Sequence, residues 1–600
     1  MRPWAPRTAP VEGAIVRTES TSVLIIGGGL VGLSASLFLS WRGVDSVLAE
    51  RHPGTSIHPR AWGLYPRTLE LLRAVGAERA VMAESAGFAG HVLNGRVESL
   101  AGPEISVSRI PEPEDVSGVS PVERIVSLSQ DRVEPILLER ARTLGSDVRF
   151  GTEAVDLVQD ADGVTATLRD RDTGREHAVR ADYVIAADGA HSPVREGLGI
   201  RRRGRGVLRH QMSVLFDADL SGPLRGRRFA ICQVRNAEVE GILGHDDSLR
   251  RGTLIVTYRP EEGERPEDFT EERCVRLVRA AIGSDGVEVG LRDVMPWEMA
   301  ALTAERLSEG RVFLAGDSAH VIPPVGGYGA NTGVQDAYDL AWKLQAVLGG
   351  TAPPALLDTY DEERRPVAEA TVRQAAMRLA ARSGVRGPDG VPGLADPLAV
   401  TFGYRYRSSA VADGLAGAEA PGSPREGGAG TGGTGAGSAD GAGSRDAGAG
   451  GAGGGAPRPD GAPGTEFTHP SLLSGRPGTR APHVWLRRGG RGVSSIDLFG
   501  PRAVLLAGAE GGAWADDARE TAERLGVPLD VHVVGRDLAE TGTDLAAALG
   551  VTARGAVLVR PDGFVAHRWR DGESSEAAVA AALARMLRRT PAPVPVPADL

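Results

Sequence analysis

A glycine-rich segment near the N-terminus constrains the fold more than any other part of the chain. The apolar run SVLII leads into Gly27, Gly29 and Gly32, and a second apolar run, VDSVLA, ends at Glu50. A strand, a tight glycine turn and a helix N-terminus form such a unit, because the free N–H groups of the helix can face a pyrophosphate. The acid that closes the second strand can accept both hydroxyls of a ribose. The segment therefore predicts a Rossmann-like dinucleotide site, for either NAD or FAD.

The bulk composition limits the other partners that this chain can have. Its 600 residues exceed what one core can organise, and 41% of them are hydrophobic, so several folded units are expected. A formal net charge of −10 argues against binding of nucleic acid or an anionic membrane. No apolar run reaches the roughly 18 residues of a membrane span, and the only cysteines, Cys232 and Cys274, lack disulfide or metal-ligand spacing. We therefore expect a cytoplasmic protein, monomer or homodimer, with small-molecule ligands and no metal.

Changes in residue pattern divide the chain into a large unit, a linker and a C-terminal unit. We expect a loose tail over 1–20 and, because large apolar side chains are almost absent there, a flexible Gly-rich linker over 412–463. Residues 464–600 alternate strand and helix in a thioredoxin-like order, but no cysteine follows Cys274, so this unit should be structural, without redox chemistry. The large unit is predicted to hold a nucleotide-binding domain in three parts, 21–95, 121–198 and 301–411, and a strand-rich substrate domain in two, 96–120 and 199–300.

A second motif, GRVFLAGDSAHVIPPVGGYGAN, decides between the two dinucleotides. A buried strand ends at Asp317, and a loop with Gly326, Gly327 and Gly329 follows it. An aspartate fixed at a strand end can accept hydrogen bonds from the polyol of a ribityl chain, and the glycines allow backbone N–H groups to approach a flat ring. FAD has a ribityl chain and NAD has none, so the motif predicts FAD.

These motifs, with a third one, resemble the group A FAD-dependent aromatic hydroxylases, which are related to p-hydroxybenzoate hydroxylase. The resemblance covers residues 21 to about 400, in the family's order, and the matching positions are Gly316-Asp317, Ala319-His320, Pro323-Pro324, Gly326-Gly327, Gly329 and Asn331, and, for the pattern DG..S.VR, Asp188, Gly189, Ser192, Val194 and Arg195. It implies an α/β fold: a Rossmann-like GR2-type FAD-binding domain with an inserted β-sheet substrate domain. Segments such as GYRYRSSAV and SSIDLFG are similar to the aromatic-polyketide branch, near the anthracycline hydroxylases of aklavinone-type substrates, which carry a thioredoxin-like C-terminal domain lacking CxxC. The loop GGYGAN differs from the aklavinone enzymes, so the substrate and the ring position stay open.

The resemblance also implies a set of cofactor contacts. Glu50 is expected to bind the adenosine ribose, Arg51 to lie near the adenine, and Asp317 to hold the ribityl chain. Arg60 is expected near the pyrophosphate and ribityl chain, and Gln130 on the flavin side. The backbone from Gly329 to Asn331 should approach the pyrimidine edge of the flavin, and Asp188 should contact both FAD and NADPH. The full set of expected cofactor-binding residues is Gly27, Gly29, Leu30, Val31, Gly32, Glu50, Arg51, Arg60, Gln130, Asp188, Asp317, Gly329, Ala330 and Asn331.

The activity implied is hydroxylation of a phenolic polyketide with O₂ and NADPH or NADH, through a flavin C4a-hydroperoxide. The Pro324 carbonyl is expected to face the substrate, and His320 is considered either as an acid/base or as a residue that orders its loop. No side chain is identified as the base that ionises the phenol. Candidate substrate-lining residues, each equally compatible with plain core, are Met212, Leu215, Phe216, Tyr258 and Trp297.

Three alternatives to hydroxylation remain open at this point. The same scaffold can support an FAD-dependent oxidase or reductase, or a Baeyer–Villiger-type oxygenase, because a fold does not determine one reaction. A non-catalytic flavin-binding scaffold is the third, although the intact PP.GG.G.N loop argues against it. The basic run Arg201 to Arg205 could attract the NADPH phosphate, but we interpret it as a run of charges exposed to solvent.

Overall fold

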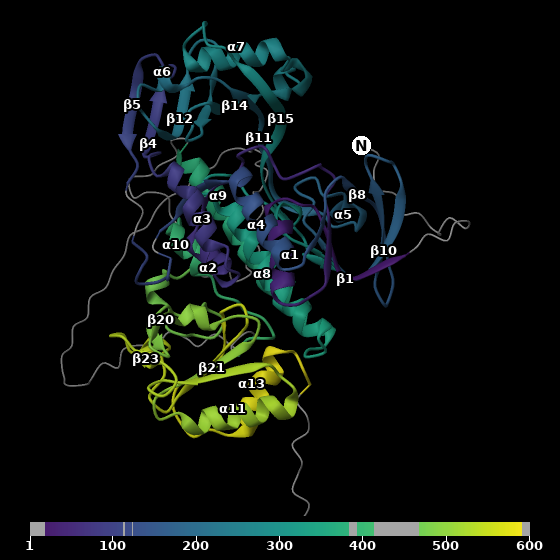
Figure 1. Cartoon of the computed structure of the whole chain (residues 1–600), viewed down its shortest axis with the longest axis vertical. Coiled ribbons are helices and arrows are strands. Elements are labelled where there is room, and N and C mark those ends of the chain that lie inside the picture. Colours follow the sequence, from purple (N-terminus) through teal and green to yellow (C-terminus); the bar gives the residue numbers. More distant parts are fainter. Residues whose placement is uncertain (1–17, 112–114, 123, 383–392, 413–466, 591–600) are drawn as a thin grey trace, which may run out of the picture.

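Three domains follow one another along the long axis of the molecule. The computed structural model describes residues 18–111, 115–122, 124–382, 393–412 and 467–590. In Figure 1 a mainly antiparallel sheet, in which only β4 and β12 pair in parallel, lies at the top, an α/β domain in the middle and a C-terminal domain at the bottom. Apart from residue 412, the expected linker lies outside the described residues. So does most of the expected tail, although the first strand already starts at Glu19.

A parallel sheet forms the centre of the middle domain, as the Rossmann-like pattern predicts. Its strands run in the order β16-β17-β10-β1-β2-β7, and the five from β17 to β7 pair in parallel. The strands are β1 (Glu19–Ile26), β2 (Ser46–Ala49), β7 (Asp147–Arg149), β10 (Glu176–Ala186), β16 (Ser308–Glu309) and β17 (Val312–Leu314), with the hairpin β8 (Thr152–Gln159) and β9 (Val164–Asp170) attached to β10. The three sequence motifs follow β1, β10 and β17, which are neighbours, so all three meet at one edge of this sheet.

Helices that pack around this sheet present the loops of the site. The long helix α8 (Tyr328–Leu348) packs along α1 (Leu30–Trp41), which in turn contacts α4 (Gln130–Thr143). Both α1 and α8 begin at the sheet edge where the motifs meet. The remaining helices of this domain are α2 (Pro66–Ala74), α3 (Glu78–Ser85), α5 (Pro193–Gly197), α9 (Asp358–Arg382) and α10 (Pro397–Phe402), and a two-stranded sheet joins β3 (Trp62–Leu64) to β6 (Val126–Ser129).

The upper domain is an eight-stranded sheet covered on its outer face by α7 (Glu271–Ile282), as Figure 1 shows. Its strand order is β18-β15-β11-β14-β13-β12-β4-β5. The strands are β4 (Leu93–Val97), β5 (Glu104–Arg109), β11 (Arg202–Asp217), β12 (Phe229–Arg235), β13 (Glu240–His245), β14 (Arg251–Tyr258), β15 (Gly290–Ala304) and β18 (His320–Val321), and the short helix α6 (Ser221–Leu224) follows β11. The sheet face opposite α7 is turned toward the middle domain.

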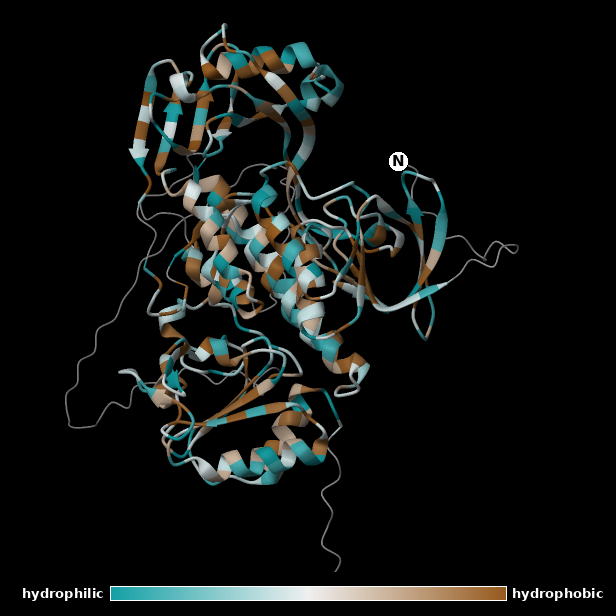
Figure 2. Ribbon diagram, viewed as in Figure 1, coloured by the Kyte–Doolittle hydropathy of each residue, from teal (hydrophilic) through white to brown (hydrophobic). Residues whose placement is uncertain are grey.

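The C-terminal domain has the strand and helix order that the sequence predicts for a thioredoxin-like unit. A four-stranded sheet in the order β22-β21-β24-β25 carries α11 and α13, and Figure 2 shows hydrophobic residues concentrated in its strands and a largely hydrophilic α11. The elements are β21 (Ala503–Ala507), α11 (Gly512–Leu525), β22 (Leu529–Val533), α12 (Leu545–Ala548), β24 (Ala556–Val559), β25 (Val565–Trp569) and α13 (Glu576–Met586). A small sheet of β19 (Trp485–Arg488), β20 (Arg491–Ser494) and β23 (Ala539–Glu540) was not expected.

Charged side chains, all of them buried, join the C-terminal domain to α8 and α9. Arg560, in the turn between β24 and β25, donates to Glu363 at 2.5 Å and to Asp339 at 3.1 Å. Lys343, the only lysine of the chain, donates to Asp339 at 2.7 Å and to Glu363 at 2.8 Å. Burial raises the pKa of Asp339 to about 7. Burial also pushes the pKa of Glu363 upward, but the attraction of Arg560 and Lys343 outweighs it and holds that pKa below its usual range.

The raised pKa of Asp339 predicts a pH dependence of stability. An unfolded aspartate titrates near pH 4, whereas the folded protein keeps this proton up to about pH 7. The stability that Asp339 contributes through this raised pKa is therefore fully present below about pH 4 and is lost as the pH rises to 7. The free energy of unfolding should fall by at most about 1.4 kcal/mol per pH unit in this range. Urea unfolding of wild type and Asp339→Asn between pH 5 and 8 should show the wild type losing stability relative to the variant. A difference that does not change with pH would contradict this assignment.

Candidate functional site

A cavity of about 2340 Å³ lies where the motif-bearing edge of the parallel sheet faces the eight-stranded sheet of the upper domain. It extends from the glycine turn after β1 to the inner face of the upper domain. The cavity brings together all of the predicted cofactor residues except Gly32 and Asn331. Those that line it are Gly27, Gly29, Leu30, Val31, Glu50, Arg51, Arg60, Gln130, Asp188, Asp317, Gly329 and Ala330.

The three glycines of the turn have different structural roles. Gly27 has a φ of +103°, and a side chain there would collide with the carbonyl oxygen of Ala187. A Cβ at Gly32 would collide with the Gly27 carbonyl oxygen, so Gly32 permits the close packing of α1 on the turn. At Gly29, by contrast, the nearest atom to an added Cβ is a Glu134 oxygen at 3.8 Å. Gly29 therefore leaves open space at the N-terminus of α1, where a pyrophosphate would fit.

Glu50 lies at the end of β2, directly beside the glycine turn. Its carboxylate accepts hydrogen bonds from the backbone N–H of Gly28 at 2.5 Å and of His52 at 2.8 Å, and it also contacts the His52 ring. The residue is buried, so its oxygens are held in a fixed orientation at the cavity wall. This is the place at which the sequence predicts the ribose of the adenosine half.

Asp317 follows β17 and is open to the cavity. Its carboxylate accepts no hydrogen bond from the described part of the chain, unlike the carboxylate of Glu50. Because protein surrounds it closely, desolvation raises its pKa, while the nearby charges of His320 and Arg60 oppose this shift. A carboxylate without a protein donor beside a cavity is suited to accept hydrogen bonds from ligand hydroxyls.

A buried aspartate of α8, Asp336, holds the loop that carries Asp317. Its carboxylate accepts the backbone N–H of Gly316 at 3.2 Å, contacts His320 Nε2 at 2.6 Å and accepts Arg364 Nε at 2.7 Å. His320 is completely buried and does not line the cavity. These contacts agree with the expectation that His320 orders its loop, and its burial away from the cavity gives no support to the acid/base role.

The glycine loop before α8 is fixed by side chains that sequence reasoning missed or assigned otherwise. Pro324 lines the cavity, but its carbonyl accepts the N–H of Gly327 at 3.1 Å, so this group belongs to a turn. Asn331 is buried, where it accepts the N–H of Tyr65 at 2.9 Å and donates to Gly327 O at 2.8 Å. The Tyr65 hydroxyl donates to Gly326 O at 2.8 Å. The side chain of Asn331 thus shapes the loop, and no motif in the sequence pointed to Tyr65.

Asp188 lines the cavity, and its carboxylate accepts two hydrogen bonds from its own turn. One oxygen accepts the Ser192 hydroxyl at 2.5 Å and the other accepts the N–H of Val194 at 3.1 Å, which ties down the start of α5. Burial raises the pKa of Asp188, against these hydrogen bonds. Each oxygen keeps a further lone pair, so the double contact to FAD and NADPH expected of Asp188 stays a prediction, and the hydrogen bonds observed here stabilise its own turn.

Glu134 organises the loop that carries Arg60. It accepts Gln130 Nε2 at 2.6 Å and the backbone N–H of Ser56 at 2.7 Å, and it is completely buried. His58, in the same loop, contacts Asp293 of β15 at 2.7 Å and so links the middle and upper domains. An acid four residues after Gln130 on one helix was the available sequence signal for Glu134, because such pairs share a helix face.

Two of the five substrate-lining residues chosen from the sequence lie on the face of the upper sheet that packs against α7, away from the cavity. Met212 and Phe216 belong to the core under α7, and Leu215 is completely buried and does not line the cavity. Tyr258 lies at the border of core and cavity, and Trp297 lines the cavity. The side chains that alternate with the core residues face the cavity instead; among them are Gln211, Ser213, Gln233, Thr253, Ile255 and Thr257. Side chains alternate along a strand, so an error of one residue selects the opposite face.

Comparison with known proteins assigns the chain to a family. Residues 20–375 match the family model "FAD binding domain", and residues 474–590 match "Aromatic-ring hydroxylase, C-terminal". The chain belongs to the FAD-dependent aromatic-ring hydroxylases. It is 41% identical to tetracenomycin A2 monooxygenase-dioxygenase of Streptomyces glaucescens over 96% of this chain and 98% of that one. It is 40% identical to an aklavinone 12-hydroxylase of Streptomyces purpurascens, covering 95% and 99% of the two chains.

A solved structure supports the same assignment for the fold of this hydroxylase. A ternary complex of aklavinone-11 hydroxylase with FAD and aklavinone has a TM-score of 0.79 and 38% identity, over 96% of this chain and all of that one. FAD is therefore the cofactor of this monooxygenase family, and the glycine turn and the free Asp317 carboxylate fit it. Among the described residues, no helix is long and apolar enough to cross a membrane.

Exposed apolar side chains concentrate in the cavity of the hydroxylase. Of the large hydrophobic residues that are exposed in the described part of the chain, only Val158, Leu472 and Trp485 lie elsewhere. The others line the cavity: Ile57, Trp62, Ile105, Val207, Ile231 and Ile242. Exposed apolar surface gathered in one concave place indicates a binding site for an apolar ligand.

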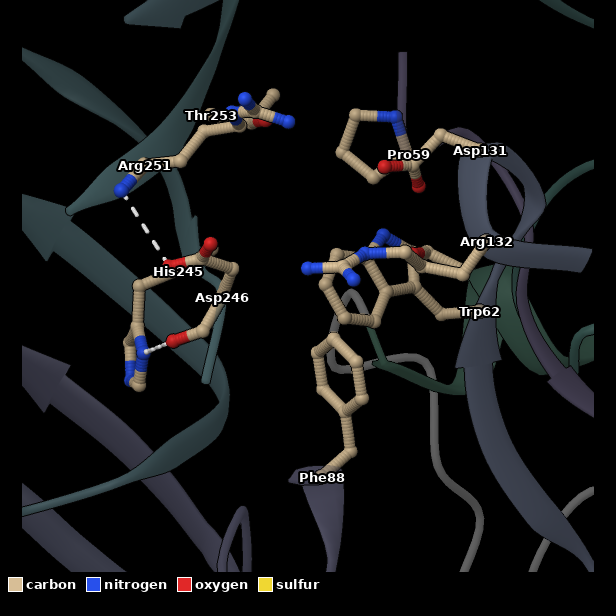
Figure 3. Close-up of a pocket in the computed structure, with 11 residues that line it drawn as sticks. Pro59, Trp62, Phe88, Asp131, Arg132, His245, Asp246, Arg251 and Thr253 are labelled. Atoms are coloured by element: carbon tan, nitrogen blue, oxygen red, sulfur yellow. Dashed lines mark hydrogen bonds between the residues drawn. The ribbon is translucent and has the colours of Figure 1, made fainter. Parts of the chain in front are cut away.

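A side branch of this cavity lies where the middle and upper domains meet. Figure 3 shows Arg251, Thr253 and Asp246 of the upper domain opposite Pro59, Trp62 and Phe88 of the middle domain. The rings of Trp62 and Phe88 pack edge to face with centroids 5.7 Å apart. Trp62 and Phe88 line both the branch and the main cavity, so the two spaces adjoin at this aromatic pair.

Proposed function

We propose that this enzyme uses O₂ and NADPH or NADH to hydroxylate a phenolic ring of an aromatic polyketide. The observation that carries the proposal is the composition of the cavity wall in the upper domain. On the sheet face, apolar side chains of β12 and β13, such as Ile231 and Ile242, lie near neutral polar ones of β11, such as Gln211 and Ser213, and charged side chains also line this wall. A flat fused-ring polyphenol has the same mixture of apolar faces and hydroxyl-bearing edges.

The residues of the middle domain support the cofactor half of this activity. Bound FAD supplies electron transfer from the nicotinamide and the activation of O₂. Glu50 is placed to accept ribose hydroxyls and Asp317 to accept ribityl hydroxyls. Gly329 and Ala330 lie in the first turn of α8, whose positive dipole end favours negative charge on a ring beside it.

The polar side chains of the upper sheet are arranged in hydrogen-bonded pairs. Trp297 donates to the Ser213 hydroxyl at 2.9 Å, and Gln211 donates to Thr257 at 2.9 Å. Each acceptor hydroxyl keeps its own proton to donate to a substrate oxygen. Ionising a phenol of pKa about 10 at pH 7 requires about 4 kcal/mol from the site, and such donors stabilise the phenolate.

The cavity size favours a fused-ring substrate over a single ring. A relative named 4-methyl-5-nitrocatechol 5-monooxygenase, from a Burkholderia species, is 41% identical over 94% of this chain, so a single-ring catechol is the competing class. Typical small-ligand pockets measure about 300–1,000 Å³, and the cavity here is about 2340 Å³. This volume leaves room for a fused-ring ligand beside FAD.

Oxygen labelling tests the proposal. The purified holoenzyme would be given NADPH or NADH, ¹⁸O₂, and a panel of tetracyclic polyphenols and substituted catechols, with products analysed by mass spectrometry. One ¹⁸O atom per product from a tetracycle, with more efficient turnover than any catechol, is expected. Oxidised product without ¹⁸O would instead identify an oxidase.

A wall variant tests the location of the substrate. Ile231→Arg places a charge in the cavity and should lower kcat/KM for the tetracycle by about tenfold or more, because an apolar contact is lost and a charge meets the ring. Val158→Arg is the matched control, since Val158 is exposed on β8 away from the cavity. Equal kinetics of Ile231→Arg and wild type would show that the substrate binds elsewhere.

A further inference from the structure

The buried charges between the C-terminal domain and the middle domain form a compact group, here called the interface charge cluster. It consists of Asp339, Lys343, Glu363, Arg560 and Asp562, each at most 3% exposed. Arg560 pairs with all three carboxylates, and Lys343 pairs with Asp339 and Glu363. Three acids thus share two cations inside the protein. Only Arg560 supplies a positive charge to this group from the C-terminal domain.

Two short steps connect this cluster to the loop that carries Asp317. Glu363 precedes Arg364 on α9, and Arg364 donates to Asp336 Oδ1 at 2.7 Å. On α8, Asp339 lies one helical turn after Asp336. Asp336 in turn binds the N–H of Gly316 and the ring of His320, which lie on either side of Asp317 in the sequence. Asp339 and Glu363, which Arg560 binds, are therefore next to Asp336 and Arg364, the residues that hold the loop.

We propose that Arg560 is a positioning residue for FAD binding. By binding Asp339 and Glu363 at once, it holds α8 against α9, so that Asp336 and Arg364 keep the Asp317 loop in the geometry that accepts the cofactor. The C-terminal domain, none of whose described residues lines the cavity, thereby contributes to the cofactor site through one arginine. The proposal depends on FAD binding and is independent of the substrate.

A second buried arginine of the C-terminal domain provides a matched comparison. Arg480 is 1% exposed and binds Glu70 of α2 through two nitrogens, with Nε to Oε2 at 3.0 Å. Glu70 is also bound by Arg67 and Ser120. Arg67 touches the interface charge cluster only by donating to the backbone carbonyl of Asp562 at 2.7 Å, and it makes no ion pair with Asp339 or Glu363. Arg480 is therefore a buried arginine of the C-terminal domain like Arg560, but its partners, Glu70, the Val119 carbonyl and the Phe402 ring, belong to neither α8 nor α9.

The test compares two double variants of the full-length protein in which one buried pair is neutralised. These are Arg560→Met with Glu363→Gln, and Arg480→Met with Glu70→Gln. Each double variant removes one positive and one negative charge, so the net charge of the buried group does not change. Each also leaves one buried charge without its ion-pair partner, Asp562 in the first and Arg67 in the second, so the two variants are matched in this cost. FAD is titrated into each apoprotein below its unfolding temperature, and the Kd is read from flavin fluorescence.

The single lysine provides a readout that is independent of FAD. An amine-reactive acylating reagent can modify only the N-terminus and Lys343, so mass spectrometry of the Lys343 peptide reports directly on opening of the cluster. Lys343 is completely buried, and slow modification is expected in wild type. Faster modification is expected in the Arg560 double variant, which removes the Arg560 contacts together with Glu363, a direct partner of Lys343, and not in the Arg480 double variant.

The expected result is an FAD Kd raised about tenfold in the Arg560 double variant, within the usual range for coupling between separate sites, with faster Lys343 acylation. The Arg480 double variant should bind FAD like wild type and keep Lys343 protected. The proposal is overturned if both double variants weaken FAD binding equally, since this would indicate general loosening of the interface. It is also overturned if a folded Arg560 double variant binds FAD like wild type.

Discussion

Replacing Asp317 with Ala is expected to yield a folded but colourless protein. The Asp317 carboxylate accepts no hydrogen bond from the described residues, so its removal leaves no protein group unpaired. In the holoenzyme it would lose charge-assisted hydrogen bonds to the ribityl chain, each worth about 1.5–3 kcal/mol. The FAD Kd should therefore rise by about a hundredfold, measured by fluorescence titration of the apoprotein. The ratio of flavin to protein absorbance after purification gives a second measure.

Asp188 supplies the control for this prediction. It follows the neighbouring strand β10, but its two oxygens cap the start of α5 through Ser192 and Val194. Asp188→Ala should therefore cost about 1–2 kcal/mol of stability, with a smaller loss of FAD affinity than Asp317→Ala. If Asp317→Ala kept its flavin, or if Asp188→Ala lost more FAD than Asp317→Ala, the assignment of the ribityl contact would be wrong.

The sequence predicted FAD and the strands that carry its motifs, because local chemistry determines both. The motifs containing Gly27, Asp188 and Asp317 each follow a strongly apolar strand, and parallel strands that are neighbours bring their carboxyl ends together. The order of the C-terminal elements was predictable for the same reason, since alternating strand and helix patterns are local. The resemblance to a family then supplied the identity of the cofactor.

The substrate half could not be predicted at the level of single residues. Strand β11 contains both Gln211 and Met212, and only the packing of α7 on one side of the sheet decides which of them faces the cavity. The roles of His320 and Asn331 were likewise hidden, because their partners Asp336 and Tyr65 are identified only by three-dimensional contacts. No sequence pattern indicated the role of Arg560, because Glu363 and Asp339, which it binds, lie about 200 residues earlier in the chain.

A pair of glycine variants should separate folding from cofactor binding within the opening motif. Gly32→Ala would push a methyl group into the Gly27 carbonyl oxygen, at the contact that lets α1 pack on β1. Backbone must move to relieve this, so a loss of about 3 kcal/mol or more of unfolding free energy is expected. Urea unfolding of the apoprotein measures it without any contribution from FAD.

Gly29→Ala has the same chemical size but a different expected outcome. Gly29 has an ordinary φ of −74°, and its added methyl would meet only Glu134 at 3.8 Å, so the apoprotein should lose at most about 1 kcal/mol. The methyl would instead occupy the space in front of the α1 N-terminus, and the FAD Kd should rise by more than about tenfold. Because the two methyls lie three residues apart in one turn, similar losses of stability in both variants would mean that the open space at Gly29 serves the fold and not the pyrophosphate.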